Sequence, residues 1–399
     1  MNSSAFTICA YNYLSKALAL AESFKKYNPD MKFTIFLVGR KKLIKDYGVN
    51  IEFIEDLNLK DYNHYAFKYD VIEFSTYLKP IILQIQLKTF DKVYYIDPDI
   101  MFFSSLAAVE AQLDHSNGVL TPHAFTSIED GKKPSDLDFS RFGSFNLGFI
   151  GVRNTPTTNA FLQWWEAKLA SFGFYEPQSG MAVDQKWIDL AFVYFEGFYI
   201  VRHTGCNVAF WNLHERKISV VNQKFWINQT TELIFIHFSS YNKSNTAIIA
   251  DKQDRFATGS RPDFQLASEQ YLALLKKNDS GIDATPYCYD YFIEGGRISN
   301  TLRRIYANHE QTFKASNVFN HQSQIHQFAK SKGLISQGQV KRNNFKDINV
   351  FTRVQSVTLF GLKMTLKVLG PDRYHMLMRY MAYMSSILNQ SKMFKVSKK

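Results

Sequence analysis

The sequence predicts an α/β protein with a mostly parallel, Rossmann-like sheet flanked by helices and a helical C-terminal extension. Short apolar runs alternate with helical stretches from the amino terminus onward, and this alternation is typical of a doubly wound parallel sheet. Residues 93–96 lack polar alternation, as expected of a strand that is buried on both faces. The 399 residues, 46% of them hydrophobic, are enough for one large core with an appendage.

The amino-terminal segment predicts a β-α-β unit. Residues 5–10 and 33–38 have the composition of strands, and residues 14–24 between them carry an apolar stripe at helical spacing. No GxGxxG follows the first strand, so a dinucleotide-binding domain would lack its phosphate loop.

The remaining elements follow from the same patterns. Pro80 is expected in the first turn of a helix, where its missing N–H costs nothing. The polar stretch at 127–141 is expected to be a mobile loop, and residues 250–340 are polar and helical in character. Further strands are expected at residues 51–54, 118–122, 145–152 and 232–238, and further helices at 77–87, at 156–169 and from 181 onward.

Cysteine usage and hydropathy indicate the compartment. Cys9, Cys206 and Cys288 are widely spaced, odd in number and form no CxxC motif, which favours buried thiols in a reducing compartment. No secretory signal is evident at the amino terminus, and no apolar window is long enough to span a bilayer. We expect a cytoplasmic protein, or one that is peripheral on the inner face of the cytoplasmic membrane.

The net charge of +11 is concentrated near the carboxyl end. Residues 341–399 contain twelve Lys or Arg against Asp347 and Asp372, which gives +10 and leaves about +1 for the rest. Six of the ten methionines lie there, among apolar residues at helical spacing. Such a basic amphipathic helix suits an anionic membrane surface; the alternatives are a packed terminal helix or an oligomer contact. Without a recognisable binding module, nucleic acid is not expected as a partner.

Two carboxylates follow the buried strand at 93–96. Asp97 and Asp99 flank Pro98, which removes a backbone donor and stiffens the chain between them. Ligands of open α/β sheets bind beyond the carboxyl ends of the strands. Hard oxygen ligands suit Mg²⁺ or Mn²⁺, which take the rest of their shell from water and substrate phosphates. The alternative is a solvated turn between strand and loop.

A second motif strengthens the metal interpretation. The segment from His237 to Lys243 ends another buried run. Together with Asp97-Pro98-Asp99, it resembles the motifs of nucleotide-sugar glycosyltransferases of GT-A fold. The closest resemblance, over roughly residues 5–245, is to glycosyltransferase family 8, the glycogenin and bacterial lipooligosaccharide galactosyltransferase group. It implies that Asp97, Asp99 and His237 hold Mn²⁺ or Mg²⁺ and that Lys243 reaches the donor diphosphate.

The sequence departs from the family pattern at two places in this motif. Ser240 stands where the family has glycine, and Ser244 and Asn245 replace a Pro-Trp pair. The close approach of the backbone to the phosphates therefore differs from the family pattern, whereas the lysine charge is kept.

The resemblance also implies a set of donor-binding residues. Ala10, Tyr11 and Tyr13 align with the loop that receives the nucleotide base, although Tyr13 also suits the core side of the following helix. Lys79 aligns with a basic residue that contacts the donor, and its alternative is a solvated residue at a helix start. Asn146, in Phe-Asn-x-Gly, aligns with a contact to a sugar hydroxyl, which would satisfy a buried carboxamide.

Asp184 and Gln185 match the Asp-Gln motif of the family, which implies a place beside the sugar and the catalytic role. The alternative for Asp184 is a helix N-cap. If family 8 is the right relative, the enzyme retains the anomeric configuration, and Asp184 or Gln185 faces the oxocarbenium-like centre. If Asp184 instead acts as the base for the acceptor hydroxyl, the configuration inverts.

The resemblance implies a metal-dependent enzyme that transfers a hexose from a nucleoside-diphosphate sugar, UDP favoured, to a glycan or glycolipid in surface polysaccharide or lipopolysaccharide synthesis. A non-catalytic binding protein on the same fold remains open, and a nucleotidyltransferase is less consistent because a Gly-rich phosphate loop is missing. The expected parts are a catalytic domain at 1–250, an accessory helical region at 251–340 and a basic tail at 341–399.

Overall fold

The computed structural model describes residues 2–315, 317–336, 352–394 and 396. The chain forms two compact units, Met1–Cys288 and Tyr289–Lys399. The first unit extends beyond residue 250, because helix α8 (Pro262–Lys277) packs on helix α1 (Leu14–Tyr27). The functional division into three parts stays a prediction.

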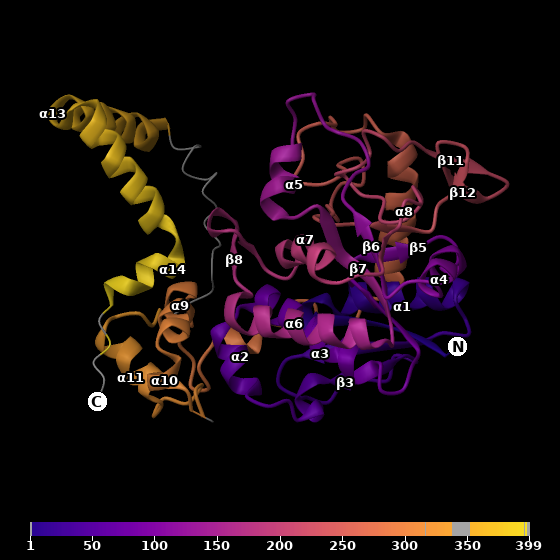
Figure 1. Cartoon of the computed structure of the whole chain (residues 1–399), viewed down its shortest axis with the longest axis horizontal. Helices are drawn as coiled ribbons and strands as arrows, with labels where there is room; N and C mark the ends of the chain where they lie inside the picture. Colours follow the sequence, from indigo (N-terminus) through magenta and orange to yellow (C-terminus); the bar gives the residue numbers. More distant parts are fainter. Residues whose placement is uncertain (1, 316, 337–351, 395, 397–399) are drawn as a thin grey trace. The chain divides into compact units, whose positions relative to one another are not determined.

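A seven-stranded sheet forms the centre of the first unit (Figure 1). β7 runs antiparallel to both of its neighbours, whereas the other pairs are parallel. The predicted fold class is therefore confirmed. In spatial order the strands are β10 (Phe198–Ile200), β6 (Gly118–Pro122), β7 (Phe145–Arg153), β4 (Lys92–Ile96), β1 (Ser3–Ala10), β2 (Lys32–Val38) and β3 (Asn50–Phe53).

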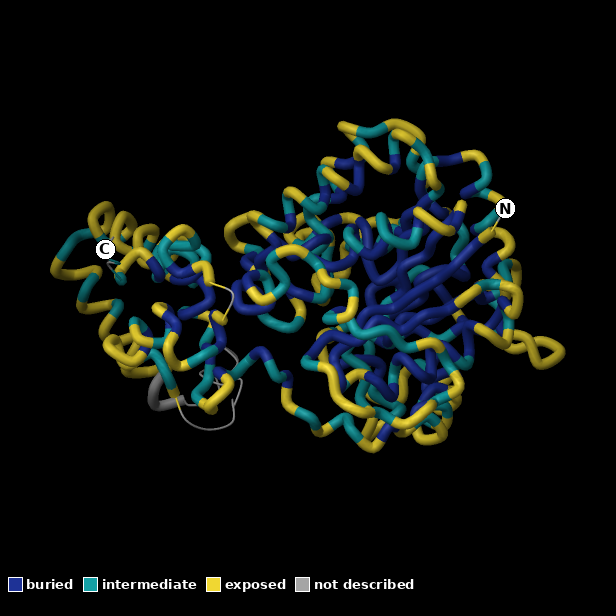
Figure 2. The backbone as a smooth tube through the Cα atoms, turned by 90° about the horizontal axis from the view of Figure 1, so that it is seen from below, coloured by how far each residue is buried: buried dark blue, intermediate teal, exposed yellow. Residues whose placement is uncertain are grey.

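Helices cover both faces of this sheet. α1 and α4 (Ala107–Leu113) contribute to one apolar cluster with inward side chains of β1, β2 and β4. α3 (Val71–Gln86) and α6 (Pro156–Phe172) pack together, and α3 contacts β1 and β4 from the other face. Figure 2 shows the strands as the most buried part of the unit. The sheet is thus covered on both faces, as its apolar strands require.

Four local expectations were wrong. α3 begins at Val71, several residues before the expected start, because Asp70 and Glu73 form a capping box, and Pro80 lies inside the helix. The stretch expected to be a loop contains α5 (Asp136–Phe142). Residue 181 begins not a helix but strand β9 (Met181–Ala182), which pairs with β8 (Tyr175–Glu176) before α7 (Gln185–Tyr194).

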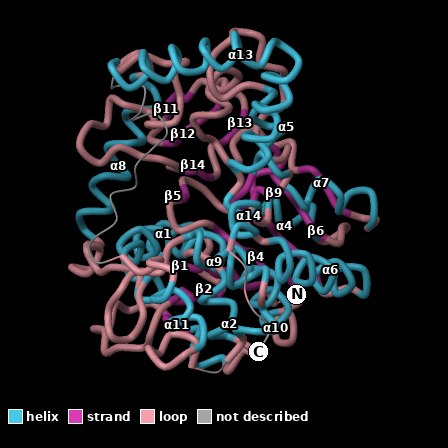
Figure 3. The backbone as a smooth tube through the Cα atoms, turned by 90° about the vertical axis from the view of Figure 1, so that its left-hand side faces the viewer, coloured by secondary structure: helices cyan, strands magenta, loops and turns pink. Residues whose placement is uncertain are grey.

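Smaller elements complete the first unit (Figure 3). β5 (Ile100–Phe102) follows the two aspartates and pairs antiparallel with β14 (Phe235–His237). A second apolar cluster lies under β11, β12, β14 and α8. The remaining elements are α2 (Tyr62–Lys68), β11 (Ile218–Val221), β12 (Lys224–Ile227), β13 (Thr231–Glu232) and the 3-10 turns at Tyr11–Tyr13, Ile54–Leu57 and Pro177–Ser179. A further 3-10 turn, Cys288–Asp290, includes the last residue of the first unit and the first two of the second.

The second unit is helical. Its longest helix, α13 (Thr352–Ser385), is interrupted at Gly370, which has a φ of 73° and is followed by Pro371. Many apolar side chains on α13 are exposed, among them Phe360, Met376 and Tyr380. None of the helices within the described ranges is long and apolar enough to cross a membrane. The other elements are α9 (Asn300–Asn308), α10 (Glu310–Phe313), α11 (Gln324–Ser331), α14 (Ile387–Gln390) and a 3-10 turn at Ser391–Met393.

The described part of the tail is a helix, as expected, with exposed basic and apolar residues. Residues 341–351, at the start of the predicted tail, lie outside the described residues. Side chains of the tail are described from residue 355 onward.

Candidate metal and substrate site

Strand register brings two carboxylates and one imidazole together. β4 ends at Ile96, so Asp97 and Asp99 emerge at the carboxyl edge of the sheet. His237 is paired with Ile100 across β14 and β5, and the Phe238 N–H donates to the Asp99 carbonyl at 2.8 Å. One ligand atom from each of Asp97, Asp99 and His237 lies within 4.8 Å of the others. The three residues that were expected to hold a metal ion therefore lie together.

The imidazole is oriented by a second contact. His237 Nδ1 lies 3.1 Å from Asn146 Oδ1, which also accepts the Gly148 N–H at 3.2 Å. If Nδ1 carries the proton, Nε2 has a free lone pair, and it lies 3.1 Å from Asp99 Oδ1. Metal-bound histidines are commonly held this way, with the second nitrogen hydrogen-bonded to an oxygen. Two carboxylates and an imidazole nitrogen fit Mn²⁺ or Mg²⁺ with open positions for substrate oxygens.

Two lysines flank the cluster. Lys16 Nζ lies 3.7 Å from Asp99, and Lys79 Nζ lies 3.8 Å from Asp97. Burial disfavours the charged form of Asp99, but the His237 and Lys16 charges outweigh burial and lower the pKa of this carboxyl below its usual range. Asp99 is therefore ionised at neutral pH. Lys16 is a site residue that the sequence reasoning missed, although its place in the helix after β1 was a usable signal.

Tyr95 also contacts the cluster. Its hydroxyl donates to Asp97 Oδ1 at 2.5 Å. Burial, and then the Asp97 charge, raise the pKa of Tyr95 well above its usual value, so the phenol remains protonated. It orients one oxygen of Asp97 and leaves the other toward His237, at 3.6 Å from Nε2.

Lys79 and Asp184 form a buried ion pair. Lys79 projects from the middle of α3, is 3% exposed, and donates to Asp184 Oδ2 at 2.7 Å and to the Leu147 carbonyl at 2.9 Å. Asp184 is 2% exposed. Burial raises the pKa of Asp184, and the Lys79 charge opposes this shift without cancelling it. Lys79 is thus not a solvated helix-start residue, and Asp184 makes no capping bond to α7.

Gln185 lies beside this pair but faces another space. Its Nε2 donates to the Phe142 carbonyl at 3.0 Å, and its side chain lines a cavity that Asn146 also lines. Val183, just before the motif, has a φ of 47°, a left-handed conformation that costs a β-branched residue energy. The Asp-Gln motif therefore places one side chain in the buried ion pair and the next in the cavity wall.

The loop after β1 holds the two tyrosines that were expected to meet a base. Tyr11 is 6% exposed, its hydroxyl donates to the Arg40 carbonyl at 2.9 Å, and Ala10 before it is buried. Tyr13 is 40% exposed and its ring carries the Lys16 ammonium at 4.2 Å. Tyr13 is therefore not a core residue, and its ring is accessible next to the lysine that pairs with Asp99.

Lys243 lies on the loop after β14. It is half exposed, and its Nζ is 3.5 Å from Asp283 Oδ2, while Asp283 Oδ1 accepts the Ser15 hydroxyl at 2.7 Å. Ser240, which stands where the family has glycine, adopts a φ of 56°. This is a left-handed conformation, which glycine adopts more readily than serine. Lys243 pairs with Asp283 instead of with a member of the metal cluster.

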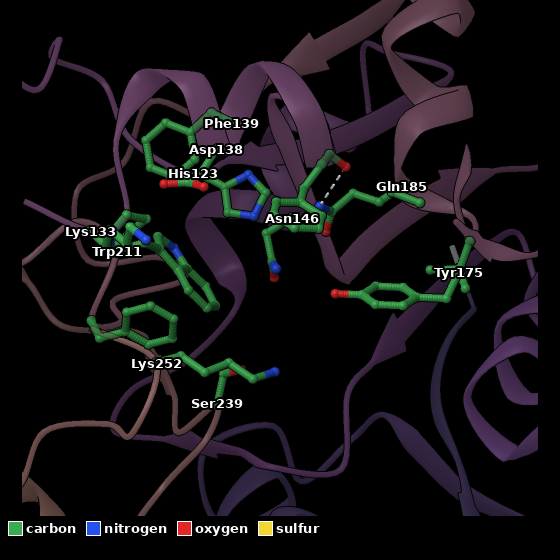
Figure 4. A pocket seen from close by; sticks show the side chains of 15 residues that line it. His123, Lys133, Asp138, Phe139, Asn146, Tyr175, Gln185, Trp211, Ser239 and Lys252 are labelled. Carbon is green, nitrogen blue, oxygen red and sulfur yellow. Dashed lines mark hydrogen bonds between the residues drawn. The ribbon is translucent and has the colours of Figure 1, made fainter. Parts of the chain in front are cut away.

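A cavity of about 330 Å³ opens beside the cluster (Figure 4). Asn146 connects the two, because it lines the cavity and contacts His237. The volume of this cavity and its mixture of apolar and polar lining residues are typical of small-molecule binding sites. The walls are aromatic with a few polar groups: His123, Lys133, Pro134, Asp138, Phe139, Phe142, Asn146, Tyr175, Ala182, Val183, Gln185, Phe210, Trp211, Ser239 and Lys252.

Substitution of Gly148 by Ala is expected to disturb the cluster. The added Cβ would lie 2.5 Å from His237 Cε1 and 2.8 Å from Asn146 Oδ1, so the imidazole must move. Loss of such an orienting contact typically weakens metal binding by about 10–100-fold. Titration of Mn²⁺ into the two proteins measures this. Gly361→Ala is the control, since nothing lies within 4 Å of its new Cβ, and equal Mn²⁺ affinity of the Gly148→Ala and wild-type proteins would contradict the prediction.

His123 is expected to make stability depend on acid pH. Burial lowers its pKa from 6.5 to about 4, so the folded chain holds fewer protons here than the unfolded chain between these values. Stability is therefore full above pH 6.5 and falls as pH drops toward 4, by about 3 kcal/mol from this residue. Urea unfolding of His123→Gln should show a shallower loss between pH 7 and pH 4. The exposed His115→Gln serves as control and should keep the wild-type slope.

Comparison with known proteins gives distant matches. No protein-family model matches the chain. It is 28% identical over 175 residues to the uncharacterized protein YfnD of Bacillus subtilis, covering 42% of this chain and 54% of that protein. It is 25% identical over 175 residues to the uncharacterized protein YfnF of the same organism, and this match covers 43% of this chain and 58% of that protein. The chain thus spans a little over half the length of these curated relatives.

Two solved structures with a similar arrangement are glycosyltransferases. One is the galactosyltransferase LgtC in complex with donor and acceptor sugar analogs, at 13% identity and a TM-score of 0.43, covering 69% of this chain and 95% of that one. Another is the glycosyltransferase GlyE of Streptococcus pneumoniae, at 14% identity and a TM-score of 0.39; the match covers 73% of this chain and 67% of that one. These likenesses are distant.

Proposed function

We propose that the protein is a metal-dependent glycosyltransferase that moves a hexose from a nucleoside-diphosphate sugar, UDP favoured, to a glycan. The observation that carries the proposal is the convergence of Asp97, Asp99 and His237 within 4.8 Å, next to a cavity of sugar-binding size. A phosphate-bearing donor on the cluster would place its sugar toward Asn146 and Gln185. The same edge of the sheet thus holds groups for both halves of a nucleotide-sugar.

The residues have separate tasks in this reaction. Mn²⁺ or Mg²⁺ on the cluster supplies Lewis-acid stabilisation for the departing diphosphate. Lys243 has a half-exposed side chain and pairs with Asp283. In the reaction its ammonium group would leave Asp283 and pair with the diphosphate. Tyr13 offers its exposed ring to the base. Lys79 holds Asp184 and Asp97 in place, so it acts on the donor through these carboxylates.

The burial of Asp184 supports a retaining course. A base for the acceptor hydroxyl must reach that hydroxyl directly, whereas the Asp184 carboxylate is 2% exposed and bonded to Lys79. The group that lines the cavity is the Gln185 amide, which is not a base. An Asp184-catalysed inverting reaction is therefore the less favoured alternative, and NMR of the anomeric proton of donor and product distinguishes the two.

A screen of nucleotide-sugars tests the proposed function. Hydrolysis or transfer should require Mn²⁺ or Mg²⁺ and should be seen with one or a few UDP-hexoses. A protein that binds UDP and Mn²⁺ but turns over no donor with any acceptor would support the rival proposal of a non-catalytic binding protein. Absence of metal-dependent nucleotide binding would contradict both.

The C-terminal helix supports a glycolipid acceptor in surface polysaccharide or lipopolysaccharide synthesis. Its exposed apolar residues, such as Phe360 and Met376, lie on a helix with five basic residues and one acidic residue. Basic, apolar helices bind anionic bilayers by area and charge together. The full chain should float with phosphatidylglycerol vesicles and not with phosphatidylcholine vesicles. Lys363→Gln with Lys367→Gln should weaken flotation, and equal flotation with both lipids would remove the membrane from the proposal.

A further inference from the structure

We propose that the acceptor of this enzyme is an anionic glycan, whose phosphate or carboxylate is bound by Lys133 and Lys252 at the rim of the cavity. The inference rests on the proposed function and adds the chemical class of the acceptor. Both lysines line the cavity and come from segments more than 100 residues apart in the chain. Figure 4 shows Lys133 and Lys252 among the side chains that surround the cavity.

The rim that carries them is held together by a network of contacts. Arg255 pairs with Asp130 at 2.5 Å and donates to the Pro134 carbonyl at 2.7 Å. The Lys133 N–H donates to Asp254 Oδ1 at 2.6 Å. These bonds join the segment around Lys133 to the segment around Lys252. The backbones that present the two ammonium groups are therefore fixed relative to each other.

The charges of the lining leave a positive excess. Among the described residues, neither the Lys133 nor the Lys252 ammonium forms an ion pair. Asp138 is the acidic residue of the lining, but its Oδ2 accepts the Ser135 N–H at 2.9 Å and the Ser135 hydroxyl at 3.0 Å, at the start of α5. His123 is neutral above acid pH because burial lowers its pKa. An anion in the cavity would meet two cations and one carboxylate that already caps a helix.

The rest of the lining suits a sugar ring. Phe139 stacks on His123 at 5.1 Å, and Trp211 meets the same imidazole edge-on at 5.3 Å. Aromatic faces bind the C–H faces of pyranose rings. Trp211 Nε1 is buried without a hydrogen-bond partner among the described residues. The cavity thus combines flat apolar walls with cations, as an acidic sugar requires.

The position of the lysines favours the acceptor over the donor. A donor diphosphate would be held by the metal cluster, and its sugar would reach the cavity past Asn146, which contacts His237. Lys133 and Lys252 come from the loops of the rim, whereas Asn146 and Gln185 form the wall next to the cluster. Lys133 and Lys252 are exposed whereas Asn146 is buried, so a molecule that enters from solvent meets the lysines first.

Calorimetry on the full chain tests the proposal. UDP and Mg²⁺ first saturate the diphosphate site, and then glucose, glucose 6-phosphate or glucuronic acid is titrated. At least one of the two charged sugars should bind about tenfold or more tightly than glucose, since charge-assisted hydrogen bonds are about twice as strong as neutral ones. A preference for glucose 6-phosphate or for glucuronic acid identifies the anion as phosphate or carboxylate.

Variants separate this inference from the proposed function. Lys133→Gln with Lys252→Gln should remove the preference for charged sugars, while Lys132→Gln, a neighbouring exposed lysine outside the lining, should keep it. UDP binding should be equal in all of these proteins. Equal affinities for charged and neutral sugars in the wild-type protein, or a preference that survives in the double variant, overturns the inference. Failure of UDP and Mg²⁺ to bind would instead refute the proposed function.

Discussion

Substitution of Asp99 by Asn should lower metal-dependent donor turnover by about 10²–10³-fold, the loss that follows removal of one electrostatic contact to a developing charge. Asp99 faces His237 Nε2 at 3.1 Å and Lys16 at 3.7 Å. An amide keeps the size of the side chain but removes the charge that a divalent ion needs. The turnover of a UDP-hexose at saturating Mn²⁺ measures the loss.

Asp30→Asn is the matched control for this change, because Asp30 is an exposed aspartate outside the site. It should retain wild-type turnover and stability. Asp99→Asn should stay folded without denaturant but unfold in urea at a lower midpoint than the wild-type protein, because the lowered pKa of Asp99 means that its charge stabilises the fold at neutral pH. Wild-type turnover by Asp99→Asn, with the fold intact, would show that Asp99 does not hold the catalytic ion.

The second large effect concerns stability. Substitution of Lys79 by Met should cost about 3–5 kcal/mol, the range seen when one partner of a buried ion pair is removed. The loss leaves Asp184 as an unpaired buried carboxylate and raises its pKa further. Because the folded chain then holds this proton to higher pH than the unfolded chain, the destabilisation should grow as pH rises from 5 to 8. Urea unfolding at the two pH values measures both quantities.

Two variants serve as controls. Asp184→Asn added to Lys79→Met should recover much of the stability and its pH dependence, because no unpaired charge remains. Lys41→Met removes a lysine from an exposed ion pair with Asp56 and should cost about 1 kcal/mol or less. If Lys79→Met lost as little stability as Lys41→Met, the pair of Lys79 with Asp184 would have to be solvated in solution.

The strands of the central sheet could be predicted from the sequence because their signal is local. β1, β2, β4 and β7 are short apolar runs, and their burial follows directly from that composition. The start of α3 lies earlier than expected because Asp70 and Glu73 form a capping box ahead of the apolar residues Val71, Ile72 and Phe74. That signal is local and was present in the sequence. Hydrophobic periodicity does not reveal α5, because this helix lies in a polar stretch and begins at a capping box of Ser135 and Asp138.

The site was predictable where a motif fixes the register. Asp97 and Asp99 follow a strand, and the pairing of β5 with β14 brings His237 to them. Asn146 was expected to contact the sugar, and the structure adds a role as the partner of His237. The partners of Lys79 and the place of Lys16 depend on contacts between segments distant in sequence. No local pattern reports such contacts.

The central claim is that Asp97, Asp99 and His237 hold a divalent ion that binds a nucleoside diphosphate. Calorimetric titration of UDP, with and without Mn²⁺, tests it most directly. The wild-type protein should bind UDP only when Mn²⁺ is present, and a protein with both Asp97→Ala and Asp99→Ala should lose this binding while it remains folded. UDP binding that is independent of Mn²⁺, or that persists in the double variant, would contradict the claim.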